Sequence, residues 1–274
     1  MHRLAPLCRL LLAAVMGLLV AGCAAKQPAA PGSDAAGAVF ETFLANQGHV
    51  PAPPAFSLAG SMSFSRGHRS GRLNYRLFGN PGQAVRLDLT TAVGGSYALL
   101  FEDKRDFIAY VPSRDTVYRH TDSRQGAARL GMPLPYTLGQ MAALASGRFG
   151  GLVPDRYVSV KAVEGGYRYA FSGDARLSAL TLDFAGHPRH LTGVGVEPWR
   201  IAFDNDEPAP GLPAPVARKL TLTTPGGASL ILRVKSLQSR PAPYPAADLE
   251  LPVPSHAVER ALDGSEDAAS LPEL

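Results

Sequence analysis

Residues 55–65 read AFSLAGSMSFS, and along this stretch apolar residues alternate with small or polar ones. Because successive side chains of a β-strand point to opposite faces of a sheet, this period of two predicts a strand with one buried face. The same alternation continues in residues 72–77 and 85–89, and turn sequences at residues 80–82 (Asn-Pro-Gly) and 94–95 (Gly-Gly) separate the segments. Together they predict antiparallel strands that are buried on one side only.

The rest of the chain adds many short strands and few helices. One helix is predicted after Ser33 or Asp34, with an apolar face in residues 39–44, and a second is capped by Thr137 and ends at Gly147. We therefore expect a mainly β fold with a few helices, built on a single curved antiparallel sheet. The further strands are predicted at residues 97–102, 106–111, 116–120, 156–162, 167–171, 179–184, 188–194, 199–203, 218–223 and 229–237.

The apolar inner face of such a sheet has to be covered. A sheet of this size curls, and the predicted helices are few and short. The inner side chains either pack into an ordinary core or leave an apolar cavity, and the alternation alone leaves both outcomes open. The candidate cavity-lining residues are Leu58, Met62, Phe64, Leu73, Tyr75, Leu87, Leu89, Leu99, Phe101, Phe107, Leu138 and Met141.

The N-terminal residues predict export. Arg3 and Arg9 precede or flank an apolar run at residues 10–21, which is the layout of a secretory signal peptide (residues 1–22). The run is shorter than the roughly 20 apolar residues that a spanning helix needs. Residues 19–23, Leu-Val-Ala-Gly-Cys, resemble the lipobox of bacterial lipoproteins, although an ordinary signal with a chance cysteine is the alternative. The resemblance implies cleavage before Cys23 and three acyl chains on it.

The sequence also predicts where the protein is located and how the segments on either side of the domain behave. Ala24 stands where an Asp would resemble an inner-membrane retention signal, which implies a lipid anchor on the periplasmic face of the outer membrane. Residues 23–34 are rich in Ala, Pro and Gly and predict a flexible tether. Residues 35–238 form one domain, and residues 239–274, Pro-rich with seven acids against two arginines, predict a disordered acidic tail.

Signals of catalysis are weak. The sequence has no G-x-S-x-G elbow, P-loop or dinucleotide fingerprint. His187 and His190 have the spacing H-x-x-H but span a Gly-Pro turn without a third ligand nearby, so an exposed turn is preferred to a metal site. No cluster of Lys and Arg is interleaved with aromatic residues, which argues against nucleic acid as a partner. We expect no enzyme activity, no cofactor and no metal.

Four segments, taken in order, resemble the LolB family of outer-membrane lipoprotein receptors. Residues 59–64 (AGSMSF) resemble its opening strand, and residues 86–94 (RLDLTTAVG) resemble a strand and loop of the pattern R-L-x-L-x-x-P-L-G. Residues 130–135 (LGMPLP), followed by Leu138, Gly147 and Phe149, resemble the region of its lid helix. Residues 212–215 (LPAP), leading to Leu220 and Leu232, resemble its closing strands, so the similarity covers residues 55–237.

The resemblance implies a half-open β-barrel closed by short helices, with a cavity for the acyl chains of a lipoprotein. Such a receptor takes lipoproteins from a periplasmic LolA-like carrier and releases them into outer-membrane lipid as a monomer, without a cofactor. Two alternatives remain: a lipoprotein of this fold that binds a lipid, glycolipid or peptide without inserting lipoproteins, and a structural lipoprotein with a filled core.

The resemblance also implies a membrane-insertion loop at Ala92, Val93 and Gly94. In the family an exposed apolar residue, usually leucine, protrudes after the third strand and is needed for insertion; here that position is Val93, and Ala92 stands where the family often has proline. Valine is smaller by one methylene, which weakens partition into a bilayer by about 0.8 kcal/mol. An ordinary hairpin residue is the alternative interpretation of Val93.

Overall fold

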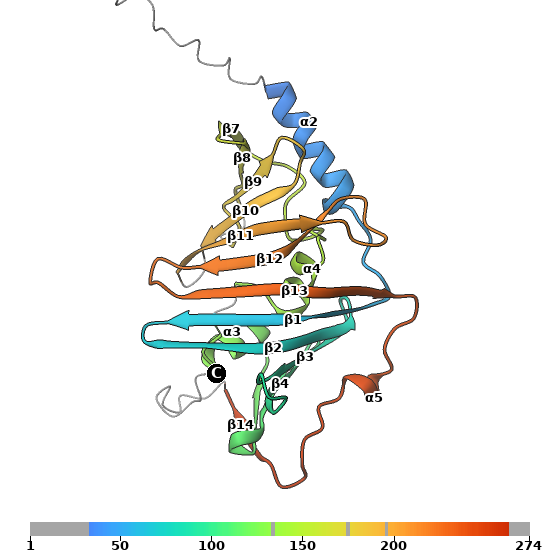
Figure 1. Ribbon diagram of the computed structural model, residues 1–274, viewed down its shortest axis with the longest axis vertical. Helices are drawn as coiled ribbons and strands as arrows, with labels where there is room; N and C mark the ends of the chain where they lie inside the picture. Colours follow the sequence, from blue (N-terminus) through green and yellow to red (C-terminus); the bar gives the residue numbers. More distant parts are fainter. Residues whose placement is uncertain (1–32, 133–134, 174–175, 195–196, 263–274) are drawn as a thin grey trace, which may run out of the picture.

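The strands of the computed structural model join into one unclosed sheet (Figure 1). The structure describes residues 33–132, 135–173, 176–194 and 197–262, and within them the sheet is 14-stranded, in the order β14-β6-β5-β4-β3-β2-β1-β13-β12-β11-β10-β9-β8-β7. β14 pairs with β6 in parallel, whereas the other paired strands are antiparallel. The predicted class, a mainly β fold with one curved and unclosed antiparallel sheet, is confirmed.

The strands follow the alternation of the sequence closely. They are β1 (Ala55–Arg66), β2 (Arg69–Asn80), β3 (Ala84–Thr90), β4 (Ser96–Glu102), β5 (Phe107–Val111), β6 (Thr116–His120), β7 (Ser159–Val163), β8 (Gly166–Ala170), β9 (Ala179–Asp183), β10 (Pro188–Val194), β11 (Pro198–Glu207), β12 (Val216–Thr223), β13 (Ser229–Arg240) and β14 (Val258–Ala261). The helical segments are α2 (Ser33–Phe43), η1 (Leu44–Gly48), η2 (Pro112–Arg114), α3 (Ser123–Arg129), α4 (Leu138–Ala145) and α5 (Ala246–Leu249).

Gly60 is required where the central strands β1 and β13 meet. The pairing shifts register between Ala59 and Gly60, and a Cβ atom on Gly60 would lie 1.8 Å from the carbonyl oxygen of Arg233 and 3.0 Å from the ring of Tyr75. The space left by the missing side chain lets the Tyr75 hydroxyl donate to that same carbonyl oxygen at 3.3 Å. Burial raises the pKa of Tyr75, so this phenol stays neutral.

Helix α2 fills the inner face of the β7–β11 half of the sheet. Its buried residues Phe40 and Phe43 lie against Tyr169 and Phe149, with ring centroids 4.9 Å and 5.4 Å apart respectively. The Tyr169 hydroxyl donates to the carbonyl oxygen of Ala36 at 2.8 Å and fixes the helix to β8. This half of the molecule is therefore an ordinary packed core.

The two helices on the other half differ in how well the sequence predicts them. α4 has the predicted cap: the Thr137 hydroxyl accepts from the Gln140 N–H, the Gln140 side chain accepts from the Thr137 N–H, and Gly147 follows with a positive φ of 70°. α3 was not predicted, because SRQGAAR carries no large apolar residue at helical spacing. It is capped by Asp122, and Gly126 lies where a Cβ atom would approach the Phe107 ring to 2.4 Å.

The predicted disorder of residues 239–274 is wrong for residues 239–262. β13 continues to Arg240, and residues 241–257 then cross the outer face of the sheet, opposite the helices, to reach β14 at the edge (Figure 1). We call residues 241–262 the C-terminal strap. Its Tyr244 and Leu249 are buried against Phe78, because the outer face of this half of the sheet carries apolar side chains that need a cover.

The predictions for the two ends fall largely outside the described residues. These are the signal peptide (1–22), the lipidation residue Cys23, most of the tether (23–34) and residues 263–274 of the tail. Ser33 and Asp34, predicted as the end of the tether, begin helix α2. Among the described residues, no helix is long and apolar enough to cross a membrane.

Candidate functional site

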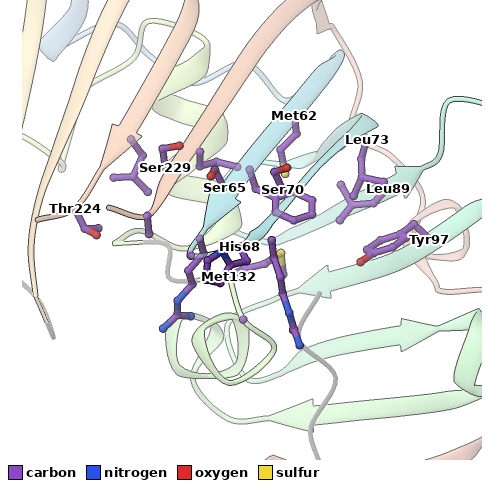
Figure 2. Close-up of a pocket in the computed structure, with 18 of the residues that line it drawn as sticks. Met62, Ser65, His68, Ser70, Leu73, Leu89, Tyr97, Met132, Thr224 and Ser229 are labelled. Carbon is purple, nitrogen blue, oxygen red and sulfur yellow. The ribbon is translucent and has the colours of Figure 1, made fainter. Parts of the chain in front are cut away.

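A cavity of about 750 Å³ lies at one end of the sheet, on its inner face (Figure 2). It is bounded by the hairpin of β1 and β2, by β3 and β4, by the turn between β12 and β13, and by Gly131 and Met132 after α3. Figure 2 shows Leu73, Leu89 and Tyr97 on one side, with Met132 in the middle of the view. Its volume is in the range of roughly 300–1,000 Å³ that is typical of ligand pockets.

The cavity exists because the helices stop short of this end. α4 packs against β3 and β12, α3 against β6, and α2 against β9. The β1–β2 hairpin extends past them: β2 and β3 last pair at Asn74 and Thr90, so residues 69–73 of β2 project further, by roughly 17 Å at about 3.4 Å per residue. None of the described helices has its main contacts with this projecting part of the hairpin, and only Gly131 and Met132, which follow α3, are described on its apolar side together with strand and turn residues.

Several predicted residues do form the cavity wall. The structure places Met62, Phe64, Leu73, Leu87 and Leu89 there. Phe64 is only partly buried, and its ring lies over Gly71, where a Cβ atom would approach it to 2.5 Å. The wall is thus made of side chains from three neighbouring strands, β1, β2 and β3, whose alternation was visible in the sequence.

Other predicted residues lie elsewhere. Leu58, Tyr75, Phe107, Leu138 and Met141 belong to the packed core and do not line the cavity.

The prediction for Leu99 and Phe101 is wrong, because both lie on the opposite face of the sheet. Leu87 faces inward and pairs with Leu100, so the neighbours of Leu100 on β4 face outward. On that outer face Leu99 packs with Tyr110 and Val117, next to Leu251 of the strap.

Sequence reasoning missed Tyr97, Met132, Leu222 and Leu230 in the wall. A register shift between Leu89 and Thr90 brings Tyr97 to the inner side along with Ala98, which a strict period of two does not predict. The polar rim of the cavity was not predicted either. The signal for it was that the β1–β2 and β12–β13 turns, which carry polar residues, lie at the same end of the sheet. The rim consists of Ser65, Arg66, Gly67, His68, Arg69, Ser70, Thr224 and Ser229.

The predicted insertion loop is a tight turn that presents Val93 to solvent. The side chain of Val93 is 94% exposed, the highest value among the exposed large apolar residues of the described chain. The Thr91 N–H donates to the Gly95 carbonyl oxygen at 2.9 Å, and the Gly94 N–H donates to the Thr91 carbonyl oxygen at 3.0 Å. Gly94 has a φ of +88°, which favours glycine at this position.

The described residues hold no group of three or more His, Cys, Asp or Glu side chains that could bind a metal ion. His187 and His190, the histidines with H-x-x-H spacing, are half-buried on the β9–β10 hairpin. His187 lies 3.4 Å from Asp183, and burial lowers the pKa of His190, with Arg200 nearby adding to the effect.

Comparison with known proteins gives a fold but no close relative. No protein-family model matches the chain, and no curated protein matches it significantly in sequence. Among solved structures, a LolA superfamily protein from Nitrosomonas europaea is similar, with a TM-score of 0.54 at 12% identity over 79% of this chain and 97% of that one. The chain has a LolA-like fold. A domain assigned to an outer membrane lipoprotein-sorting protein from Vibrio parahaemolyticus has a TM-score of 0.50 at 13% identity, over 80% of this chain and 97% of that one.

The LolA-like fold accounts for the general architecture. The expected curved and unclosed antiparallel sheet with few helices is the shared feature, and identities of 12% and 13% carry the comparison no further than the fold. What the chain does therefore has to be argued from its own cavity, rim and loop.

Proposed function

We propose that this chain is a lipid-anchored receptor of the outer membrane that takes up the acyl chains of lipoproteins and releases them into the bilayer. The observation that carries the proposal is the apolar cavity left open at one end of a LolA-like sheet. Burying hydrocarbon there is favourable by about 0.8 kcal/mol per methylene, so a chain of ordinary length gains enough to leave water.

The position of the Val93 loop supports the release step. Because β1, β2, β3 and β4 run antiparallel in sequence order, the β3–β4 turn lies at the same end of the sheet as the β1–β2 hairpin, beside the cavity. An exposed apolar tip next to the cavity gives hydrocarbon a short route into a bilayer. We propose that Ala92, Val93 and Gly94 form the membrane-insertion loop.

The proposed anchor and partners complete this model. Acyl chains on Cys23 would hold the domain on the periplasmic face of the outer membrane, since several chains give stable anchoring where one does not. A periplasmic LolA-like carrier would deliver the lipoprotein to the cavity. Transfer then requires only that the cavity, and after it the bilayer, bind hydrocarbon more favourably than the carrier does, so we propose a monomer that works without enzymatic activity or a cofactor.

The alternative is an outer-membrane lipoprotein of the same fold that binds a lipid, glycolipid or peptide without insertase activity. Val93 favours it, because valine partitions into a bilayer less strongly than the leucine usual in the LolB family. Depleting the protein separates the two: lipoproteins should accumulate in the periplasm only if this chain is their receptor. Normal localisation after depletion would overturn the receptor proposal.

The cavity itself is tested by native mass spectrometry of the full chain carrying Cys23→Ser. Copurified or added acyl compounds should be retained in a one-to-one complex. A chain that retains none would indicate a structural lipoprotein and would overturn both binding hypotheses.

A further inference from the structure

One row of residues crosses the outer face of the sheet from β7 to β2 (Figure 1). Its members lie directly opposite one another on nine neighbouring strands, which spans roughly 38 Å at about 4.8 Å per strand. The row faces outward, because Leu180, Leu191 and Ile201 beside it along the strands belong to the inner core. It contains Lys161, Arg168, Thr181, His190, Thr221 and Arg72, and none of its residues is Asp or Glu.

Four cations on this face have no carboxylate partner. Lys161, Arg168 and Arg72 belong to the row, and Arg200 lies next to it on β11, on the same face. All four are exposed, and among the described residues none of them forms an ion pair. We call these four residues the cationic band.

The carboxylates of the same face lie further from the cavity end and are paired. Asp204 lies 3.1 Å from the Lys219 ammonium group. Asp183 and Asp206 each lie 2.7 Å from the guanidinium group of Arg189, so one cation is shared by two acids. Positive charge is therefore in excess only on the part of the outer face that is nearer to the cavity.

The cationic band is close to the mouth of the cavity. Arg200 lies opposite Thr223, the last residue of β12, and the β12–β13 turn that follows bounds the cavity. Arg72 directly precedes Leu73 of the cavity wall. Glu197, on the β10–β11 turn, is a carboxylate at this end and offsets part of the charge. The excess of cations nevertheless accompanies the open end of the molecule.

The free protein holds these charges at a cost. Lys161 and Arg168 are directly opposite each other on β7 and β8, and like charges in that arrangement destabilise a strand pair. His190 experiences the same positive field: burial lowers its pKa most, and the charges of Arg200 and Arg168 lower it further against the opposing charge of Asp204. An anionic partner would relieve this repulsion.

The length of the cationic band indicates the kind of partner. Its cations are spread over roughly 38 Å, which suits an extended array of anions better than one small ion. The headgroups of anionic phospholipids form such an array, and cationic side chains near an anionic membrane surface are attracted to it. The exposed apolar Val93 lies at the same end of the sheet, where it can enter the bilayer beneath the headgroups.

We propose that the cationic band docks the cavity end of this chain on the anionic phospholipids of the membrane, with the cavity opening toward the bilayer. The inference rests on the proposed function, in that it takes the membrane as the place of release, and it adds the class of lipid and the surface that recognises it.

The test measures co-sedimentation of the full chain carrying Cys23→Ser with phosphatidylcholine vesicles that contain or lack phosphatidylglycerol. Residues 1–22 are common to every variant, so differences between variants report the domain. The unsubstituted chain should prefer the anionic vesicles, and added salt should weaken that preference because it screens exposed charges.

Two double variants assign the preference to the cationic band. Arg168→Gln with Arg200→Gln should lower partition onto anionic vesicles roughly tenfold and leave partition onto pure phosphatidylcholine unchanged. Lys104→Gln with Arg105→Gln removes the same charge from the exposed β4–β5 turn, at the opposite end of the sheet, and should bind as the unsubstituted chain does. Thermal unfolding of both variants checks that each one folds.

The outcomes separate this inference from the proposed function. Equal partition of the unsubstituted chain onto both kinds of vesicle, or a preference that survives in the Arg168/Arg200 variant, would overturn the docking surface. Slow transfer by that variant from a loaded carrier to uncharged vesicles would indicate that the band binds an acidic surface of the carrier, and the lipid assignment would be wrong. Binding of a fluorescent fatty acid tests the cavity separately: its absence in the unsubstituted chain would overturn the proposed function, whatever the vesicles show.

Discussion

The backbone N–H of Leu138, the first residue of α4, donates to the Glu102 carboxylate of β4 at 2.7 Å. The Gly139 N–H donates to the other carboxylate oxygen at 3.2 Å, and the Ser123 hydroxyl at the start of α3 also donates to Glu102. One carboxylate, itself only 9% exposed, thus holds the first turns of both helices that cover this half of the sheet. A negative charge at a helix N-terminus is stabilising because the free N–H groups there carry partial positive charge.

Glu102→Gln should therefore destabilise the fold. The amide removes the charge and directs N–H groups at donors that need an acceptor, which we expect to lower the free energy of unfolding by about 1–3 kcal/mol. Urea denaturation followed by circular dichroism measures it. Glu164→Gln, on the exposed β7–β8 turn, is the matched control and should change little. Equal stability of the two variants would show that Glu102 does not hold the helices.

Val93→Glu should leave stability unchanged and stop release of lipoproteins to membranes. The side chain is almost fully exposed, so the fold does not depend on it, whereas a carboxylate opposes entry into hydrocarbon. Transfer from a loaded carrier to outer-membrane vesicles is the measurement. Val158→Glu, at another exposed valine before β7, is the control and should transfer normally.

A larger apolar side chain at the same position should strengthen the binding of the loop to a bilayer. Val93→Leu adds one methylene, which is worth about 0.8 kcal/mol, so partition of the chain onto vesicles should rise roughly fourfold. Vesicle co-sedimentation measures it. No gain with leucine, together with normal transfer by Val93→Glu, would leave this turn without a role at the membrane.

Leu73→Trp should block the cavity. Leu73 is on the cavity wall, and the larger ring fills space that is empty in the free protein, so acyl binding should weaken by at least about tenfold with little loss of stability. Ile231→Trp adds the same bulk to β13 at a residue that does not line the cavity and should bind normally. Displacement of a fluorescent fatty acid compares the two. Unchanged binding by Leu73→Trp would place the ligand elsewhere.

Asn80→Ala should loosen the C-terminal strap. The Asn80 amide donates to the Tyr244 carbonyl oxygen at 2.9 Å and accepts from the Tyr244 N–H at 2.8 Å, and both bonds are buried. Losing them should lower the free energy of unfolding by about 1–3 kcal/mol and expose Phe78 to a hydrophobic dye. Asn74→Ala, on the exposed side of the same strand, is the control. Equal dye binding by the two variants would contradict the assignment.

Asp122 should make stability depend on pH in the acid range. A hydrogen bond from the Gln125 N–H is the main cause that lowers the pKa of Asp122; burial opposes it, and the charge and backbone N–H of Arg124 add to the lowering. A pKa that folding lowers gives stability that is complete above the ordinary value of 3.8 and is lost as the pH falls through the lower folded value. Asp122→Asn, which still caps α3, should flatten this loss. Unfolding measured from pH 6 down to pH 2 compares the two, and parallel curves would contradict the prediction.

The sequence predicts what is decided locally. The alternation around Leu58 and Met62 defines the inner face of β1, and Thr137 with Gln140 defines the start of α4, because each signal depends on neighbours within a few residues. Even the exposed turn at Val93 follows from the glycines beside it.

What the sequence does not predict is decided at a distance. The inward turn of Tyr97 depends on a register shift against β3, and the outward position of Leu99 depends on its partner strands. The strap takes an ordered conformation because it packs on an apolar outer face, and that face is assembled from β2 and β4–β6. The open end of the cavity depends on where three helices stop, which no single segment encodes.

The strap joins the centre of the sheet to its margin. It leaves the end of β13 and returns as β14 beside β6, so it spans the outside of the strands whose inner side forms most of the cavity wall. Because both ends of the strap are held in the sheet, it opposes flattening of the strands between them. The strap therefore helps to keep the wall of the cavity curved, although its residues lie on the other face of the sheet.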